Sequence, residues 1–104
     1  MKAVRVVIRQ YVDDAFPGWV ECALVEASGR EVRFVEKVPV VTASNLVSDS
    51  SYPESGVIAC EVLKGGQDSA GRDLATISTG QPWGVESVDG QTTFEVFYDQ
   101  LVEI

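Results

Sequence analysis

The side chains that could carry out chemistry in this 104-residue chain are carboxylates and two cysteines, because histidine is absent. Without histidine, neither a serine nor a thiol has the usual neighbouring base. Cys22 and Cys60 each lie between apolar residues two positions away, which predicts buried reduced thiols that act as small hydrophobic side chains. A disulfide between them would require their strands to be neighbours, and zinc would need carboxylates as its further ligands. We therefore expect no metal and no cofactor.

Acidic pairs are the second candidate for chemistry. Asp13 and Asp14 are adjacent, and Asp68 and Asp73 flank a loop, but their spacing does not match a calcium-binding loop. The glycines at 65–66 lack the lysine and hydroxyl residue of a phosphate-binding loop. Acids in such loops are usually solvated, so the inventory predicts a protein that is not an enzyme.

Glu36 is the one charged side chain that the strand pattern directs inward, beside Val20. A buried carboxylate must be paired or protonated, and such groups cluster at functional sites. An enzyme that uses Glu36 as its acid or base is therefore an alternative hypothesis. The competing interpretation is that the end of the strand turns Glu36 outward into water.

The net charge of −8 is distributed unevenly along the chain. Residues 1–40 hold six basic and six acidic side chains, whereas residues 41–104 hold two basic side chains and ten acidic ones. Such a field repels nucleic acid and anionic lipid and favours a basic partner. The alternative is that the acidity only keeps a small protein soluble.

The residues at 18–38 predict a β-hairpin around which the rest of the chain is organised. Two alternating segments flank Ala27-Ser28-Gly29, which suits a three-residue loop ending in a left-handed glycine. That register places Leu24 opposite Val32, Cys22 opposite Phe34 and Val20 opposite Glu36. One face of the hairpin is then apolar almost to its end.

Further strands follow from alternation and from turn residues. We predict a first strand at 2–12, a second hairpin whose strands are 56–63 and 73–79, and a third hairpin at 84–99 with a two-residue loop at Asp89-Gly90 that pairs Val85 with Phe94 and Ser87 with Thr92. Pro39 limits 38–42 to an edge strand or a bulge. The stretch 42–55 reads as a long loop in which Ser44 could cap one helical turn.

These elements predict an all-β fold, a small antiparallel barrel or sandwich of about seven strands: one N-terminal strand followed by three hairpins. Each strand has one apolar face, and a single open sheet would leave that face in water. The length fits a single β-domain over residues 1–104. The start of the chain lacks the apolar core of a signal peptide and no segment could span a membrane, so we expect a cytoplasmic protein.

Each hairpin is entered through an aromatic residue and a proline. If the hairpins run in the same sense, one mouth of the barrel is rimmed by Phe16, Trp19, Tyr52 and Trp83, with Asp13 and Asp14 beside them. Rims of this kind are where small folds bind ligands and partners. The alternative is that the aromatic side chains only plug the barrel end.

The sequence therefore yields three hypotheses for function. The first is a non-catalytic acidic module, of the size and charge of an immunity protein, that docks a basic partner protein through its acidic face and aromatic rim. The second is a binder of a small ligand at the barrel mouth, and the third is the enzyme that uses Glu36. No nucleic acid or membrane partner is expected, and the edge near Pro39 allows either a monomer or a homodimer.

Overall fold

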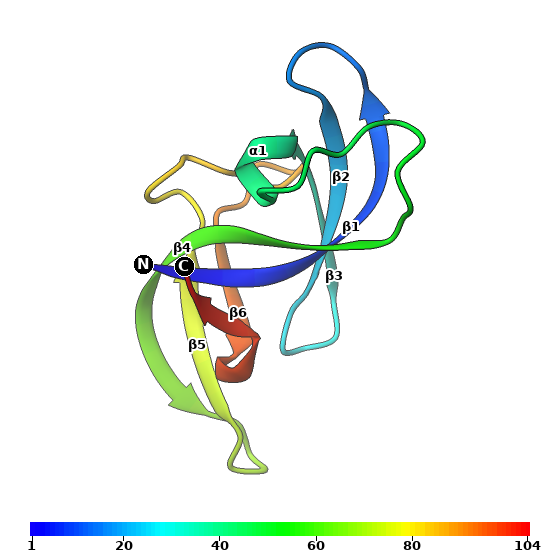
Figure 1. Cartoon of the computed structure of the whole chain (residues 1–104). Helices are drawn as coiled ribbons and strands as arrows, with labels where there is room; N and C mark the ends of the chain where they lie inside the picture. Colours follow the sequence, from blue (N-terminus) through cyan, green and yellow to red (C-terminus); the bar gives the residue numbers. More distant parts are fainter.

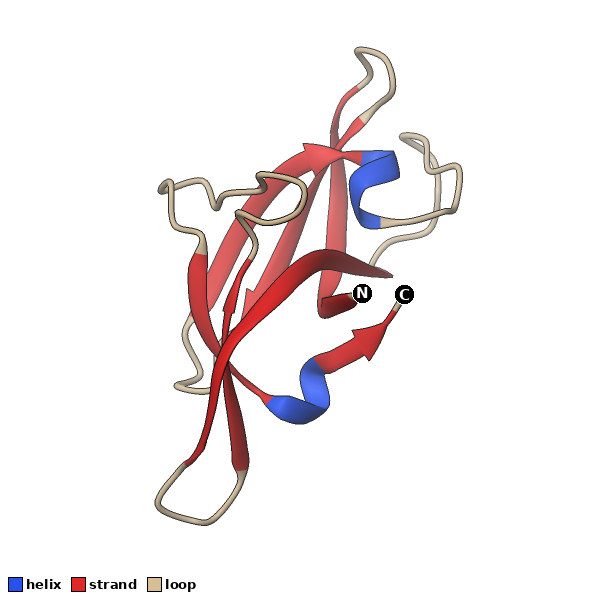
Figure 2. Cartoon of the chain, turned by 90° about the vertical axis from the view of Figure 1, so that its left-hand side faces the viewer, coloured by secondary structure: helices blue, strands red, loops and turns tan.

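Antiparallel strands form most of the protein, and a computed structural model describes all residues, 1–104 (Figure 1). The elements are β1 (Lys2–Asp13), β2 (Trp19–Val25), β3 (Glu31–Lys37), α1 (Val38–Val41), β4 (Glu54–Gln67), β5 (Asp73–Ser78), β6 (Thr93–Phe97), the 3-10 helix η1 (Tyr98–Gln100) and β7 (Leu101–Glu103). The all-β class and the number of strands are confirmed. The strands lie in one sheet that curls into a half-barrel, with the helical turns at its margins (Figure 2).

Two long strands are shared between neighbours, and this sharing makes the sheet curl. The strand order is β3-β2-β1-β4-β5-β6, and β7 also pairs with β1. The first part of β1 pairs with β4 and its second part with β2, while β4 leaves β1 after Cys60 and continues with β5. Bulges interrupt β1 between Ile8 and Gln10 and β4 between Val62 and Lys64. A bulge bends its strand, so each long strand can serve two differently oriented parts of the sheet.

The two ends of the sheet approach each other across the core. The amide of Val88 donates to the carbonyl of Arg33, at 2.9 Å, and the amide of Ala27 donates to that of Glu95, also at 2.9 Å. The rings of Phe34 and Phe94 meet edge to face in the interior, with their centroids 5.6 Å apart. The predicted inward faces are confirmed, because the core is built from Val4, Val6, Ile8, Val20, Cys22, Leu24, Val32, Phe34, Ile58, Cys60, Ala75, Ile77, Phe94 and Val96, among others.

The first hairpin has the predicted register. Leu24 pairs with Val32, Cys22 with Phe34 and Val20 with Glu36. The loop closes through a hydrogen bond from the Glu26 amide to the Arg30 carbonyl, and Gly29 has a φ of 88°. The three-residue loop is thus confirmed.

The same loop geometry occurs twice more. In the second hairpin the Asp68 amide donates to the Arg72 carbonyl around Gly71, and β4 extends to Gln67, so this loop is shorter than the predicted 64–72. Gly65 and Gly66 have no side chains whose alternation could have indicated a strand. In the last unit the amide of Ser87 donates to the carbonyl of Gln91 around Gly90.

The prediction for the third hairpin is wrong in two respects. The loop at Gly90 has three residues and not two, because the Ser87 hydroxyl also accepts the Gln91 amide at 3.0 Å and favours the longer turn. Residues 84–92 do not form a strand; they are held by contacts such as the hydrogen bond from the Thr79 hydroxyl to the Val85 carbonyl, at 2.7 Å. Phe94 consequently pairs with Ile77 on β5 and not with Val85.

Two further local predictions are corrected. Val38–Val41 forms the helical turn α1 and not an edge strand, because Pro39 suits the first turn of a helix and Val38 and Val41 both bury their side chains. Ser44 starts no helix; Leu46 enters the core there and the rest of the segment is loop. The short strand β7 was not anticipated, since three residues carry too little alternation to be read.

Gly56 allows β4 to pass close to β1 and α1, and we predict that Gly56→Ala destabilises the fold. A Cβ there would lie 2.8 Å from Ile8 Cδ1 and 2.9 Å from the Val41 carbonyl oxygen. Overpacking of this kind costs about 1–3 kcal/mol of unfolding free energy, measured by urea denaturation.

The matched control is Gly66→Ala on the same strand, where a Cβ meets no atom within 4 Å. That variant should be neutral or stabilised by up to about 1 kcal/mol. Equal stabilities of the two variants would contradict the close approach at Gly56.

Candidate functional site

The turn between β1 and β2 presents Phe16 to solvent. Asp13 begins the turn, and its carboxylate accepts the Ala15 amide at 2.8 Å. The amide of Gly18 donates to the Ala15 carbonyl and closes the turn. Phe16 lies between these bonds, and 96% of its surface is exposed. An apolar ring held so far out by a hydrogen-bonded turn adds nothing to the core and is available to a partner.

A cavity of about 520 Å³ lies beside this ring. Phe16 and Pro17 form one side of it, and α1 with the loop 42–47 forms the other. The hydroxyl of Tyr52 donates to the Val47 carbonyl at 2.8 Å and anchors that loop, and the ring of Tyr52 packs against the core. Phe16 and Tyr52, far apart in the sequence, therefore both lie beside the loop 42–47.

Acidic side chains surround this end of the molecule. Asp13, Asp14, Asp49 and Glu54 are all exposed, and none of them forms an ion pair. The pKa of Tyr52 is raised above its usual value by burial, and the nearby ring of Tyr11 and carboxylates of Glu54 and Asp49 add to the shift.

We call the group formed by Asp13, Asp14, Phe16, Asp49, Tyr52 and Glu54 the acidic end. Asp49 and Glu54 were not among the predicted site residues, because only the folding of the loop brings them near Tyr52. Their one signal in the sequence is that they flank that tyrosine.

The predicted rim of four aromatic residues does not form one mouth. The Lys37 ammonium lies over the ring of the half-buried Trp19, 5.6 Å from its centroid. Trp83 is 63% exposed and lines a different cavity, whose lining also includes Pro39 and other residues of α1. Phe16 and Trp83 therefore line two different cavities beside α1, while Tyr52 packs against the core. Core side chains fill the interior of the barrel, so its end is not hollow.

Glu36 lies where the register predicts, opposite Val20, but it is only half-buried. Its carboxylate accepts the amide of Lys37 at 3.3 Å and lies near the thiol of Cys22. No second acid or base makes a hydrogen bond with it. No group of three or more metal-ligating side chains comes together anywhere in the chain.

Both cysteines are free and buried, which confirms the prediction of reduced thiols. Their strands are not neighbours, since β1 runs between β2 and β4. Cys22 pairs with Ile8 and Cys60 with Lys2, six residues apart on β1, or about 20 Å. Burial raises the pKa of Cys22 to about 12, helped by Glu36 and Glu21, and burial also raises the pKa of Cys60. Neither thiol is an activated nucleophile.

Ion pairs follow the division of charge along the chain. Three of them lie within residues 1–40, namely Arg9–Glu31, Arg30–Glu26 and Arg33–Glu21. In residues 41–104 only Glu103 is paired, with Lys2 and the N-terminal amine, which holds its pKa below the usual value. The other nine acids of that part have no cationic partner: Asp49, Glu54, Glu61, Asp68, Asp73, Glu86, Asp89, Glu95 and Asp99.

Comparisons of the chain with protein-family models, with curated proteins and with solved structures found no match. Neither α1 nor any other helix has the length and apolar character that a membrane crossing requires.

The buried thiol of Cys22 should make the fold sensitive to alkaline pH. An unfolded thiol ionises near 9.0, whereas the folded one keeps its proton to about 12. The unfolded state therefore binds fewer protons above pH 9, and the unfolding free energy falls as the pH rises from 9 toward 12. Urea denaturation from neutral pH to about pH 11 measures this slope.

The control for that slope is Cys22→Ala, which removes the thiol and leaves every tyrosine and lysine in place. We expect the variant to be less stable at neutral pH because of the lost volume, and to lose less stability at alkaline pH than the parent. Parallel pH profiles for the two proteins would show that Cys22 does not contribute.

Proposed function

We propose that this protein is a non-catalytic interaction module that docks a basic partner protein through its acidic end. The observation that carries the proposal is the placement of Phe16, a fully solvated phenyl ring among carboxylates that have no ion-pair partners. A small acidic inhibitor of a basic toxin, of the immunity-protein kind, is one module of this description, by analogy of size and charge alone.

The two components of the acidic end would have different roles. Burial of the Phe16 ring in an apolar recess of the partner would contribute about 1.5–3 kcal/mol and supply affinity. The carboxylates of Asp13, Asp14, Asp49 and Glu54 would form a polar rim that steers a basic surface toward that ring. The net charge of −8 extends the same attraction over longer distances.

We also infer that the protein acts in the cytoplasm. Its two cysteines are unpaired thiols, as is usual for proteins in reducing compartments. Cys22 and Cys60 could not pair with each other without rebuilding the sheet, because β1 separates their strands.

The test is capture of partners from a native lysate, followed by calorimetric titration of each purified candidate. We expect a basic protein whose affinity falls steeply as salt rises from ~0.1 M to ~1 M, because the Debye length shortens from ~10 Å to ~3 Å. Phe16→Ala should weaken binding at least about tenfold, as loss of a central anchor does.

The control is Tyr98→Ala, which removes an exposed aromatic ring on η1, away from the acidic end. It should change the affinity less than about threefold. A double variant, Asp13→Asn with Asp14→Asn, should slow association and flatten the salt dependence. Binding that is insensitive to salt, or equally weakened by Phe16→Ala and Tyr98→Ala, would exclude this mode of docking.

A further inference from the structure

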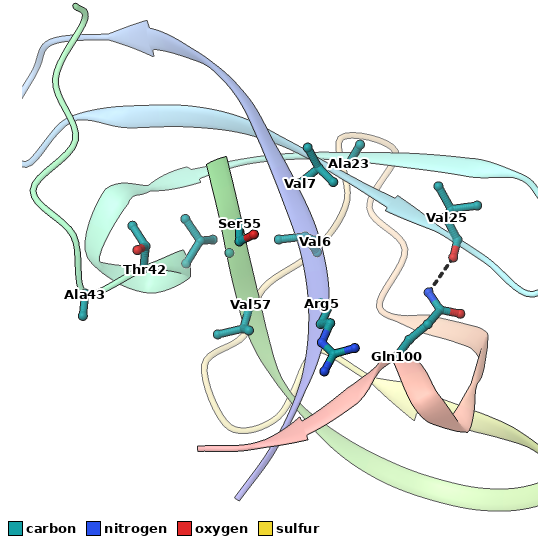
Figure 3. A pocket seen from close by; sticks show the side chains of 12 residues that line it. Arg5, Val6, Val7, Ala23, Val25, Thr42, Ala43, Ser55, Val57 and Gln100 are labelled. Atoms are coloured by element: carbon teal, nitrogen blue, oxygen red, sulfur yellow. Dashed lines mark hydrogen bonds between the residues drawn. The ribbon is translucent and has the colours of Figure 1, made fainter. Parts of the chain in front are cut away.

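A second cavity, unrelated to the acidic end, lies on the outer face of the sheet where β2, β1 and β4 run side by side. It has a volume of about 540 Å³, within the range of small-molecule sites. Most of its lining is aliphatic: Val7, Ala23, Val25, Val41, Ala43 and Val57. Figure 3 shows Thr42 and Ala43 at one end of the cavity and Arg5 and Gln100 at the other.

The cavity exists because β1 changes partner on one edge. On that edge β1 pairs with β7 from Lys2 to Val4, and its pairing with β2 starts only at Val7. Arg5 and Val6 fall in the gap between these two partners. Gln100 spans the gap, because its side-chain amide donates to the Val25 carbonyl at 2.8 Å (Figure 3).

Arg5 is the only charged residue that lines this cavity. It forms no ion pair, although the chain has twice as many acidic as basic side chains. One guanidinium nitrogen donates to the backbone carbonyl of Asp99 at 3.2 Å, and the other donors have no protein acceptor. A guanidinium has five such donors in a planar fork that matches a carboxylate.

The cavity continues into a neighbouring one of about 420 Å³. The two share Val41, Thr42, Ala43 and Val57 as lining, and the second ends at the exposed ring of Trp83. Together they form a mainly apolar groove with a cation at one end and an indole at the other. We call it the Arg5 groove.

We propose that the Arg5 groove binds a small monocarboxylate with an aliphatic body. The carboxylate would pair with the free donors of Arg5, and the chain would lie along Val57 and Ala43 toward Trp83. Charge complementarity selects one anionic group: the groove holds a single cation, and a polyanion would be repelled by the net charge of −8. The site shares no residue with the acidic end and does not depend on the proposed docking function.

The test uses decanoate as the probe, with decanol and decyltrimethylammonium as neutral and cationic analogues of the same chain length. By calorimetry at physiological salt, we expect decanoate to bind most tightly, decanol less tightly and decyltrimethylammonium least tightly. Arg5→Gln should weaken decanoate at least about tenfold and leave decanol within about threefold, because a charge-assisted hydrogen bond is lost and the apolar contacts remain.

Arg9→Gln is the matched control. Arg9 lies on the same strand and the same face, but it pairs with Glu31 and lies outside the groove. It should bind decanoate as the parent does. A blocking variant, Val57→Glu, should abolish binding, because Val57 pairs with Arg5 across β1 and β4 and the new carboxylate would occupy its donors.

Several results would overturn the proposal. These are no binding of decanoate by the folded parent protein, equal affinity for the three probes, or equal loss in Arg5→Gln and Arg9→Gln. Tighter binding of a peptide through its C-terminal carboxylate than of decanoate would also exclude a small-molecule site. Phe16→Ala should bind decanoate normally, so a failure of partner docking and a failure of this proposal can be told apart.

Discussion

The constraint on which the structure depends is that one strand, β1, has only two edges and must serve three partners. One edge pairs with β4, and the other is divided between β7 and β2. The bulge after Ile8 turns the second part of the strand away, so that β2 and β3 fold back over the core. Both candidate surfaces follow from this division. The bent end of β1 leads into the turn that carries Phe16. The gap between β7 and β2 leaves Arg5 without a paired residue on that edge of β1.

The charge pattern matches the same architecture. The strands β1, β2 and β3 carry paired charges: Arg33 of β3 pairs with Glu21 of the neighbouring strand β2, and Arg9 of β1 pairs with Glu31 of β3. The loops and the β4–β6 part carry acids that no cation offsets. Such acids repel one another, and of those in residues 41–104 only Asp68 and Asp73 accept hydrogen bonds through their carboxylates, at the loop of the second hairpin. The stability of this part of the sheet comes mainly from burial of Ala75, Ile77, Phe94 and Val96. An excess of acids without ion-pair partners is the kind of feature that a partner can use.

Local features of the fold could be predicted from the sequence, and non-local ones could not. The register of the first hairpin follows from its loop and from alternation, both of which lie within twenty residues, and Gly29 and Gly71 indicate their turns in the same local way. The partner exchange of β1 and β4 depends on bulges that alternation does not reveal. Phe16 and Tyr52 could be recognised as candidates because each is followed directly by a proline, which is a local signal. Arg5 has no such local signal. The Arg5 groove needs β2, β1, β4 and the segment after α1 to come together, and no stretch of sequence contains them.

The segment that follows α1 separates the two candidate surfaces. Thr42 and Ala43 line both the cavity beside Phe16 and the Arg5 groove. A shared wall transmits binding from one site to another only if it has two arrangements that the two ligands stabilise differently. This wall is fixed on both sides: Val41 is buried before it, and Leu46 enters the core after it, where Tyr52 also holds the Val47 carbonyl. A wall anchored in this way favours one arrangement, and we therefore expect the acidic end and the Arg5 groove to bind their ligands independently.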